Sequence, residues 1–212
     1  MPGLKLKDLV GIPWMLAFAL RADGWWLRRD NIWDKPNPMP EPTKDRPSTT
    51  HEYVFLLSKS RRYFYDADAV REPLAPKTLT TFGTTRRVNN DGLGLVKAEN
   101  YGRSAPNRKP RLTAGGELAG ANCRSVWTIA SQKYDDGHRA TFPEALPSRC
   151  SKAGSRQGDV VLDCFCGRGT TGVVAVRLDR DFVGIELNPS YAAKARRNIG
   201  NATPLLAEER PA

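Results

Sequence analysis

Apolar residues recur at helical spacing near the start of the chain. Residues such as Ile12 and Leu16 lie three or four positions apart, which predicts an amphipathic helix over residues 8–22. Pro13 fits this helix only if it lies in the first turn, where a missing backbone N–H costs nothing. Gly24, which follows an aspartate, predicts the end of the helix.

Shorter apolar runs come next and favour strands. The aromatic-rich residues 25–33 predict one strand, and residues 53–57 predict a second, buried one. Between them, residues 35–42 carry proline at every second position, which excludes both a helix and a paired strand and predicts an extended loop. Residues 72–125 show no sustained period and are rich in Gly, Asn, Thr and Arg, so we expect an irregular insert there.

The last third of the chain is regular again. Residues 159–163 predict a strand, 167–172 a turn and 170–178 a helix. A second strand over 181–186 and a second helix over 189–199 follow at once. Strands and helices that alternate with short connections predict an α/β fold with a parallel, doubly wound sheet.

Charge and composition narrow the class of protein. Among 212 residues, 33 Lys and Arg exceed 23 Asp and Glu, which gives a net charge of +10 and favours a polyanionic partner. The four cysteines have no Cys-x-x-Cys spacing and only two histidines are present, so we expect free thiols and no metal site. The apolar run at residues 9–20 is too short to span a membrane. These features predict a cytoplasmic protein.

The strongest candidate chemistry lies where the third predicted strand ends. Gly167, Gly169 and Gly172 satisfy the pattern G-x-G-x-x-G, so a dinucleotide site is one interpretation. However, Asp163 ends the strand four positions before Gly167, and its carboxylate would repel a pyrophosphate. It would attract a cationic ligand instead, and S-adenosylmethionine carries an ammonium and a sulfonium but no phosphate.

Glu186 is the second anchor of the predicted site. It ends the next strand, 23 residues after Asp163, at the spacing from which a carboxylate reaches ribose hydroxyls. A dinucleotide and S-adenosylmethionine both need such a carboxylate, so Glu186 does not discriminate between them. A nicotinamide-dependent oxidoreductase therefore remains an alternative.

The whole segment Asp163-Cys-Phe-Cys-Gly-Arg-Gly-Thr-Thr171 resembles the D-P-F-x-G-S-G-T-T signature of DNA methyltransferases that act on exocyclic amines. Residues 184–191 and 138–146 resemble the neighbouring motifs of that family. The resemblance implies a Rossmann-like, S-adenosylmethionine-dependent methyltransferase fold with a mostly parallel sheet. It assigns cofactor binding to Asp163, Phe165, Cys166, Gly167, Gly169, Thr170, Thr171, Glu186, Leu187, Asn188, Phe142 and Pro143.

The resemblance also implies an organisation for the chain. Residues 1–71 would form the catalytic-half helices and strands, 72–125 a basic target-recognition insert, 126–202 the cofactor-binding half and 203–212 a tail. Residues 86–111 include seven basic residues and two acidic ones. The expected partner is double-stranded DNA with a flipped target base. The predicted DNA-binding residues are Lys35, Asn37, Arg86, Arg87, Arg103, Arg108, Lys109 and Arg111.

The sequence departs from the family pattern in three places. Cys164 replaces the usual proline, and Arg168 replaces the usual serine, where it either points to solvent or weakens cofactor binding. The third departure is an absence, because no Pro-Pro pair exists to form the D/S/N-P-P-Y/F/W tetrad that binds the target amine. We therefore expect either an N-terminally truncated enzyme or one half of a split enzyme completed by an N-terminal fragment. Cytosine N4 and adenine N6 both remain candidate targets.

Overall fold

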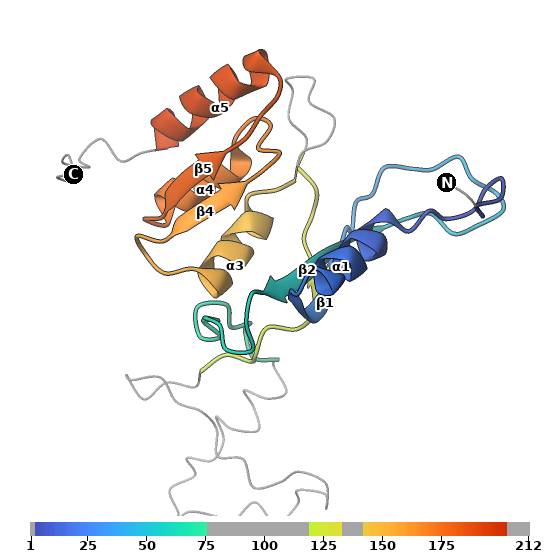
Figure 1. Ribbon diagram of the computed structural model, residues 1–212, viewed down its shortest axis with the longest axis horizontal. Coiled ribbons are helices and arrows are strands. Elements are labelled where there is room, and N and C mark those ends of the chain that lie inside the picture. Colours follow the sequence, from blue (N-terminus) through green and yellow to red (C-terminus); the bar gives the residue numbers. More distant parts are fainter. Residues whose placement is uncertain (1–2, 76–118, 133–141, 203–212) are drawn as a thin grey trace, which may run out of the picture. The chain divides into compact units, whose positions relative to one another are not determined.

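The computed structural model describes residues 3–75, 119–132 and 142–202 (Figure 1). The chain divides into two compact units, Met1–Asp66 with Arg124–Ala212, and Ala67–Cys123. In the larger unit, the described elements form two sheets with helices packed beside them. This is the α/β class that the alternating pattern predicts, and the strand pairs β1–β3 and β4–β5 are parallel.

The first element, α1, is shorter than predicted. It spans Ile12–Ala22, so residues 8–11 are not helical and the predicted start at residue 8 is wrong. Gly11 lies at φ 73° immediately before the helix, and Pro13 lies in its first turn. The left-handed glycine and the proline together fix the start. At the other end Gly24, at φ 94°, ends the helix as the sequence predicts.

The first sheet has the order β2-β1-β3. Strand β1 spans Trp26–Asp34 and pairs antiparallel with β2, His51–Ser58, while β3, Val126–Thr128, lies parallel to β1. Both long strands confirm the prediction to within a few residues, and the proline-rich segment between them is neither helix nor strand. Strand β3 was not predicted, because three residues are too few to show a period.

Aromatic side chains hold this part together. The Trp14 ring of α1 lies edge-on to Tyr53 and Phe55 of β2, with centroids 5.4 and 5.0 Å apart. Trp33 is 3% exposed, and its indole N–H donates to the Ile129 carbonyl at 2.8 Å. Because buried indole N–H groups need an acceptor, this bond fixes the segment after β3 against β1.

The second sheet carries the candidate site. Strands β4, Val160–Asp163, and β5, Asp181–Gly184, pair in parallel, and helix α4, Thr170–Arg177, connects them. Helix α5, Pro189–Ala202, follows with proline at its first position, as predicted. The strand predicted over residues 181–186 is two residues longer than β5. The Ile185 N–H still donates to the Asp163 carbonyl at 2.9 Å.

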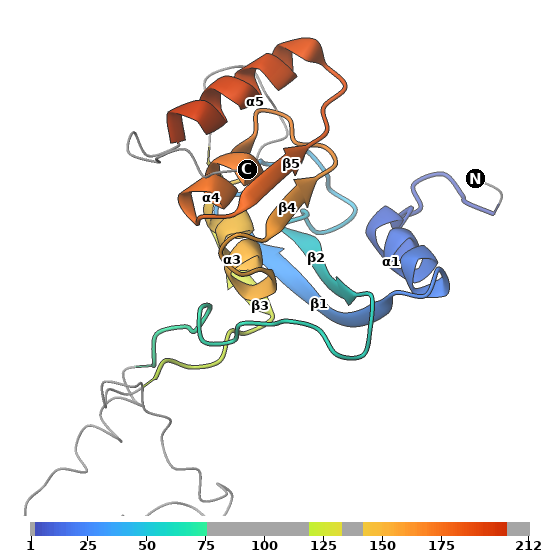
Figure 2. The same ribbon diagram turned by 60° about the vertical axis from the view of Figure 1, so that its left-hand side comes forward.

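Helices cover one face of β4 and β5 (Figure 2). Helix α4 contacts both strands as well as α5 and α3, which spans Ala145–Gly154. Close packing depends on Gly172, where an added Cβ would lie 2.5 Å from Ile199 and 2.7 Å from the Phe182 ring. The sequence pattern did not reveal α3, because Pro147 and two serines give it little periodicity.

In the smaller unit, the described residues are the two ends of the predicted insert. Glu72 and Ala121 form an antiparallel bridge with hydrogen bonds of 2.9 and 2.8 Å. The Arg71 guanidinium donates to the Gly120 carbonyl at 2.7 Å and to the Asp68 carboxylate at 2.7 Å. These bonds hold the beginning and the end of the insert side by side.

Candidate functional site

Asp163 closes β4 and organises the loop that follows it. One oxygen of its carboxylate accepts a hydrogen bond from the Phe165 N–H at 3.0 Å. The other accepts from the Thr171 hydroxyl at 2.6 Å, and Thr171 is the second residue of α4. The negative charge of Asp163 therefore lies at the N-terminal turn of α4, where the helix dipole favours an anion.

Glu186 links the loops that follow the two parallel strands. Its Oε2 atom accepts from the Gly167 N–H at 2.9 Å, and its Oε1 atom accepts from the Asn188 N–H at 2.8 Å. A carboxylate can accept about four hydrogen bonds, so lone pairs remain on both oxygens. The structure thus brings together Asp163, Gly167 and Glu186, which the sequence predicted to form one site.

The glycines allow the loop to turn tightly against α5. Gly167 and Gly169 have φ values of 54° and 85°, in the left-handed region that favours glycine. An added Cβ on Gly169 would lie 3.0 Å from the backbone of Ala195. The turn is closed by the Gly169 N–H, which donates to the Cys166 carbonyl at 2.7 Å.

The acidic surroundings affect the thiol of Cys166. Burial raises its pKa, and the negative charges of Asp163 and Glu186 raise it further, because both causes disfavour a thiolate. Two negative charges thus act on this loop, in addition to the effect of burial, and they suit a cationic ligand.

This shift gives a measurable pH dependence. In a variant with Cys166 as its only cysteine, we expect half-maximal alkylation above pH ~8.5, the value for an unperturbed thiol, because the thiolate is the reacting form. Adding Asp163→Asn removes one negative charge and should move the profile to lower pH. Asp181→Asn, at the other end of the strands, should leave it in place. A profile centred below that of a free cysteine would contradict the electrostatic account.

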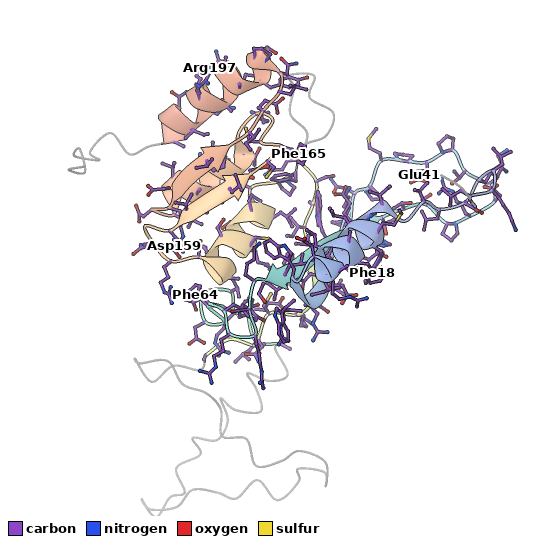
Figure 3. The ribbon with its side chains drawn as sticks, viewed as in Figure 1. Phe18, Glu41, Phe64, Asp159, Phe165 and Arg197 are labelled. Atoms are coloured by element: carbon purple, nitrogen blue, oxygen red, sulfur yellow. The ribbon has the colours of Figure 1, made fainter. Side chains whose placement is uncertain are left out.

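The structure places the remaining predicted cofactor residues in different surroundings. Phe142 lines a cavity of about 400 Å³ whose walls also include Asp163 and Thr171, and the side chain of Pro143 is fully buried. Phe165 is 90% exposed and Leu187 is 97% exposed. Figure 3 labels Phe165 in the loop after β4, at the end opposite Asp159. Both apolar side chains are thus available to a ligand, whereas Asn188 accepts from the Ser190 N–H at 2.9 Å at the start of α5.

The predicted DNA-binding residues within the described ranges are engaged in other contacts. Lys35 forms an ion pair with Glu52 and lies 4.6 Å from the centre of the Trp33 ring. The Asn37 amide donates to the Ser131 carbonyl at 3.1 Å and accepts from the Ser131 N–H at 2.9 Å. These contacts fix the extended loop to the segment after β3. The predicted contacts Arg86, Arg87, Arg103, Arg108, Lys109 and Arg111, and the tail 203–212, lie outside the described residues.

Two residues that support the site escaped the sequence analysis. Asn198 of α5 donates its side-chain amide to the Arg168 carbonyl at 2.9 Å, which fixes the middle of the loop. Gly184 ends β5, and an added Cβ there would lie 2.7 Å from Phe182 and 3.0 Å from the Cys166 sulfur. The Asn198–Arg168 and Gly184–Cys166 contacts join segments that are remote in sequence, so the local pattern did not predict them.

Arg168, which departs from the family signature, lies away from the first cavity. It lines a separate cavity of about 210 Å³ together with Arg177 and Asn198. Among the described residues, no helix is long and apolar enough to cross a membrane. The same residues hold no group of three or more His, Cys, Asp or Glu side chains placed to bind a metal.

Comparisons with known proteins identify relatives of this chain. A family model described as DNA methylase matches residues 8–197. The type II methyltransferase M.SmaI of Serratia marcescens is 43% identical over 197 residues, which cover 93% of this chain and 54% of that protein. The chain spans about half the length of the curated relatives it matches.

Solved structures show the same fold at low sequence identity. The PvuII DNA methyltransferase, described as cytosine-N4-specific, gives a TM-score of 0.59 at 18% identity and covers 93% of this chain and 59% of its own. A structure described as an M1.HpyAVI–SAM complex gives a TM-score of 0.52 at 19% identity. The match covers 90% of this chain and 71% of that one. The match over most of its length, together with the Asp163–Glu186 loop geometry, shows that this chain belongs to the DNA methylase family of N6 and N4 methyltransferases.

Proposed function

We propose that this chain is the part of a DNA methyltransferase that binds S-adenosylmethionine, which the whole enzyme uses to methylate cytosine N4 or adenine N6. The observation that carries the proposal is the position of the Asp163 carboxylate. It accepts a hydrogen bond from Thr171 in the first turn of α4, at 2.6 Å. The site thus combines a nucleoside-binding β-α-β frame with negative charge at the helix N-terminus.

This position discriminates between the two candidate cofactors. A dinucleotide places its pyrophosphate at the N-terminus of the helix after the first strand. Here the Asp163 carboxylate is held at that helix terminus by the Thr171 hydroxyl. A carboxylate at that position repels a diphosphate but stabilises the ammonium and sulfonium of S-adenosylmethionine. The geometry therefore favours a methyltransferase over a nicotinamide-dependent oxidoreductase.

The residues present fit the cofactor. Asp163 would hold the ammonium, directly or through water, and the free lone pairs of Glu186 would accept from the ribose hydroxyls. Gly167 and Gly169 allow the backbone to approach closely, and Phe142 and Leu187 supply apolar contacts. When bound, the cofactor supplies an activated methyl group on its sulfonium.

DNA binding is assigned to the basic segment at residues 86–111. Lys and Arg side chains neutralise phosphates and release counterions, which gives an affinity that falls with salt. Lys35 and Asn37 are proposed to border the DNA from the extended loop. The ion pair with Glu52 leaves donors of the Lys35 ammonium available. The target base would have to leave the helical stack to meet the methyl group.

The isolated chain is expected to transfer no labelled methyl groups to duplex DNA above background. The sequence lacks the Pro-Pro pair of the tetrad that binds the target amine and positions it for transfer. Adding a fragment that carries the tetrad should restore transfer, whereas a fragment with its two prolines replaced by alanine should not. Transfer by the chain on its own would show that the tetrad is dispensable here.

A further inference from the structure

Exposed cations gather at one end of the β1–β2 pair. Trp26 begins β1 and pairs with Ser58, which ends β2, so the beginning of β1 and the end of β2 lie side by side (Figure 2). Residues 26–30 and 58–63 contain one acidic residue, Asp30. The same segments carry five exposed basic residues, which we call the basic patch: Arg28, Arg29, Lys59, Arg61 and Arg62.

The patch residues differ from other cations of the chain in having no carboxylate partner. The ion pairs found within the described residues involve Lys7, Lys35, Arg46, Arg71 and Arg177. In that part of the chain, none of the five patch residues forms an ion pair. Like charges that are held close together repel, so an anionic partner would stabilise the patch.

The backbone of β1 presents two arginines in succession. The pairing register shifts between Leu27 and Arg29, which leaves Arg28 as an extra residue in a β-bulge. Side chains of a regular strand alternate between its two faces, whereas the neighbours Arg28 and Arg29 are both exposed. Because bulges change the direction of side chains, this irregularity helps to concentrate positive charge at one place.

The turn after β2 carries the other three cations. The Ser58 hydroxyl donates to the Ser60 carbonyl at 2.9 Å, and the Ser60 hydroxyl donates to the Arg62 carbonyl. These bonds fix the backbone that presents Lys59, Arg61 and Arg62. A turn that is ordered in advance loses less conformational entropy when a ligand binds.

Aromatic rings lie beside two of the patch cations. The Lys59 ammonium is 4.0 Å from the centre of the Trp25 ring, and the Arg28 guanidinium donates to the Tyr63 hydroxyl at 3.3 Å. Cation–π contacts hold a charge in place without neutralising it. Proteins that bind single-stranded nucleic acids need aromatic faces on which bases stack. Because Trp25 and Tyr63 contact cations instead, the arrangement favours a partner that presents phosphates, as duplex DNA does.

We propose that the basic patch binds the phosphate backbone of double-stranded DNA outside the recognised sequence. The proposal rests on the proposed function and adds a second, sequence-independent DNA contact. Lys35 and Asn37 follow the C-terminal end of β1, whereas the patch lies at its beginning. At about 3.3 Å per residue, the stretch from Arg29 to Lys35 spans roughly 20 Å. The patch is therefore distinct from the loop proposed to border the target.

Fluorescence anisotropy with a labelled duplex of mixed sequence tests the patch in the full chain. Replacing Arg29, Arg61 and Arg62 by glutamine removes three charges and leaves Arg28 and Lys59 beside their rings. Each phosphate contact contributes about 0.9 to the slope of log affinity against log salt concentration. The triple variant should therefore lose between about 2 and 3 of that slope, and about tenfold or more in affinity at low salt.

A matched triple variant removes the same net charge elsewhere. Lys5, Arg196 and Arg197 are exposed and lie outside the patch, so their replacement by glutamine should change the affinity by less than about threefold. Acetylation followed by mass spectrometry gives a local measurement on the unaltered chain. The duplex should slow acetylation of Lys59 several-fold and leave that of Lys5 unchanged.

The outcomes distinguish this proposal from the proposed function. Equal losses in the two triple variants would mean that total charge alone attracts DNA, which overturns the proposal. So would unchanged acetylation of Lys59 in the presence of duplex, tighter binding of a single strand of the same length, or no binding of duplex at all. In each of these cases, binding of S-adenosylhomocysteine by the chain would leave the proposed cofactor site standing. Its absence would reject the proposed function itself.

Discussion

Asp163→Asn is expected to weaken S-adenosylhomocysteine binding by about 10- to 100-fold, because hydrogen bonds to charged groups are worth about 1.5–3 kcal/mol. The amide keeps the shape of the carboxylate but loses the charge that would face the ammonium. It also places a donor where Asp163 now accepts from the Thr171 hydroxyl or the Phe165 N–H. Titration calorimetry measures the effect directly.

Asp181→Asn is the matched control for this substitution. Asp181 lies at the start of β5 and is exposed, at the end of the strand pair away from the glycine loop. It carries the same charge as Asp163 and differs in position alone. We expect less than a twofold change in affinity. Equal losses at both positions would mean that the general negative charge of the chain, and not the Asp163 carboxylate, attracts the cofactor.

Gly169→Ala should destabilise the chain strongly. A left-handed backbone costs alanine about 1–2 kcal/mol, and the added Cβ would lie 3.0 Å from the Ala195 backbone. Overpacking of a filled contact adds about 1–3 kcal/mol. We expect a clear fall in the thermal midpoint, by several degrees, and a matching loss of cofactor affinity, because Gly169 caps α4 beside the site.

Gly200→Ala is expected to have the opposite effect on stability. Gly200 lies in α5, the helix that Gly169 contacts. Gly200 lies within α5, and nothing lies within 4 Å of the position its Cβ would take. Alanine there should stabilise the helix by about 0.5–1 kcal/mol. If the thermal midpoints of the two variants shift in the same direction, the close packing of the glycine loop on α5 does not explain the effect of Gly169→Ala.

The sequence predicted best where a local pattern carries the information. The β4-α4-β5-α5 order follows from apolar runs, glycine turns and Pro189, and the structure confirms it. The sequence predicted that Gly167 and Glu186 follow adjacent parallel strands, and the structure joins them by a hydrogen bond. Such residues meet because the ends of parallel strands share one edge of a sheet.

What the sequence missed depends on contacts between remote segments. Gly11 and Pro13 delay the start of α1, although the apolar period continues upstream. Strand β3 exists because it pairs with β1, and a three-residue strand has no period of its own. Asn198 donates a hydrogen bond to Arg168, which lies 30 residues earlier in the sequence, and no motif near either residue predicts this contact.

The central claim is that a carboxylate at the N-terminus of α4 selects a nucleoside that carries an ammonium group over a dinucleotide. Calorimetric titration of the unaltered chain with S-adenosylhomocysteine and, separately, with NAD tests it most directly. The account predicts saturable one-to-one binding of S-adenosylhomocysteine and no measurable heat with NAD. Binding of NAD that is as tight or tighter would contradict it.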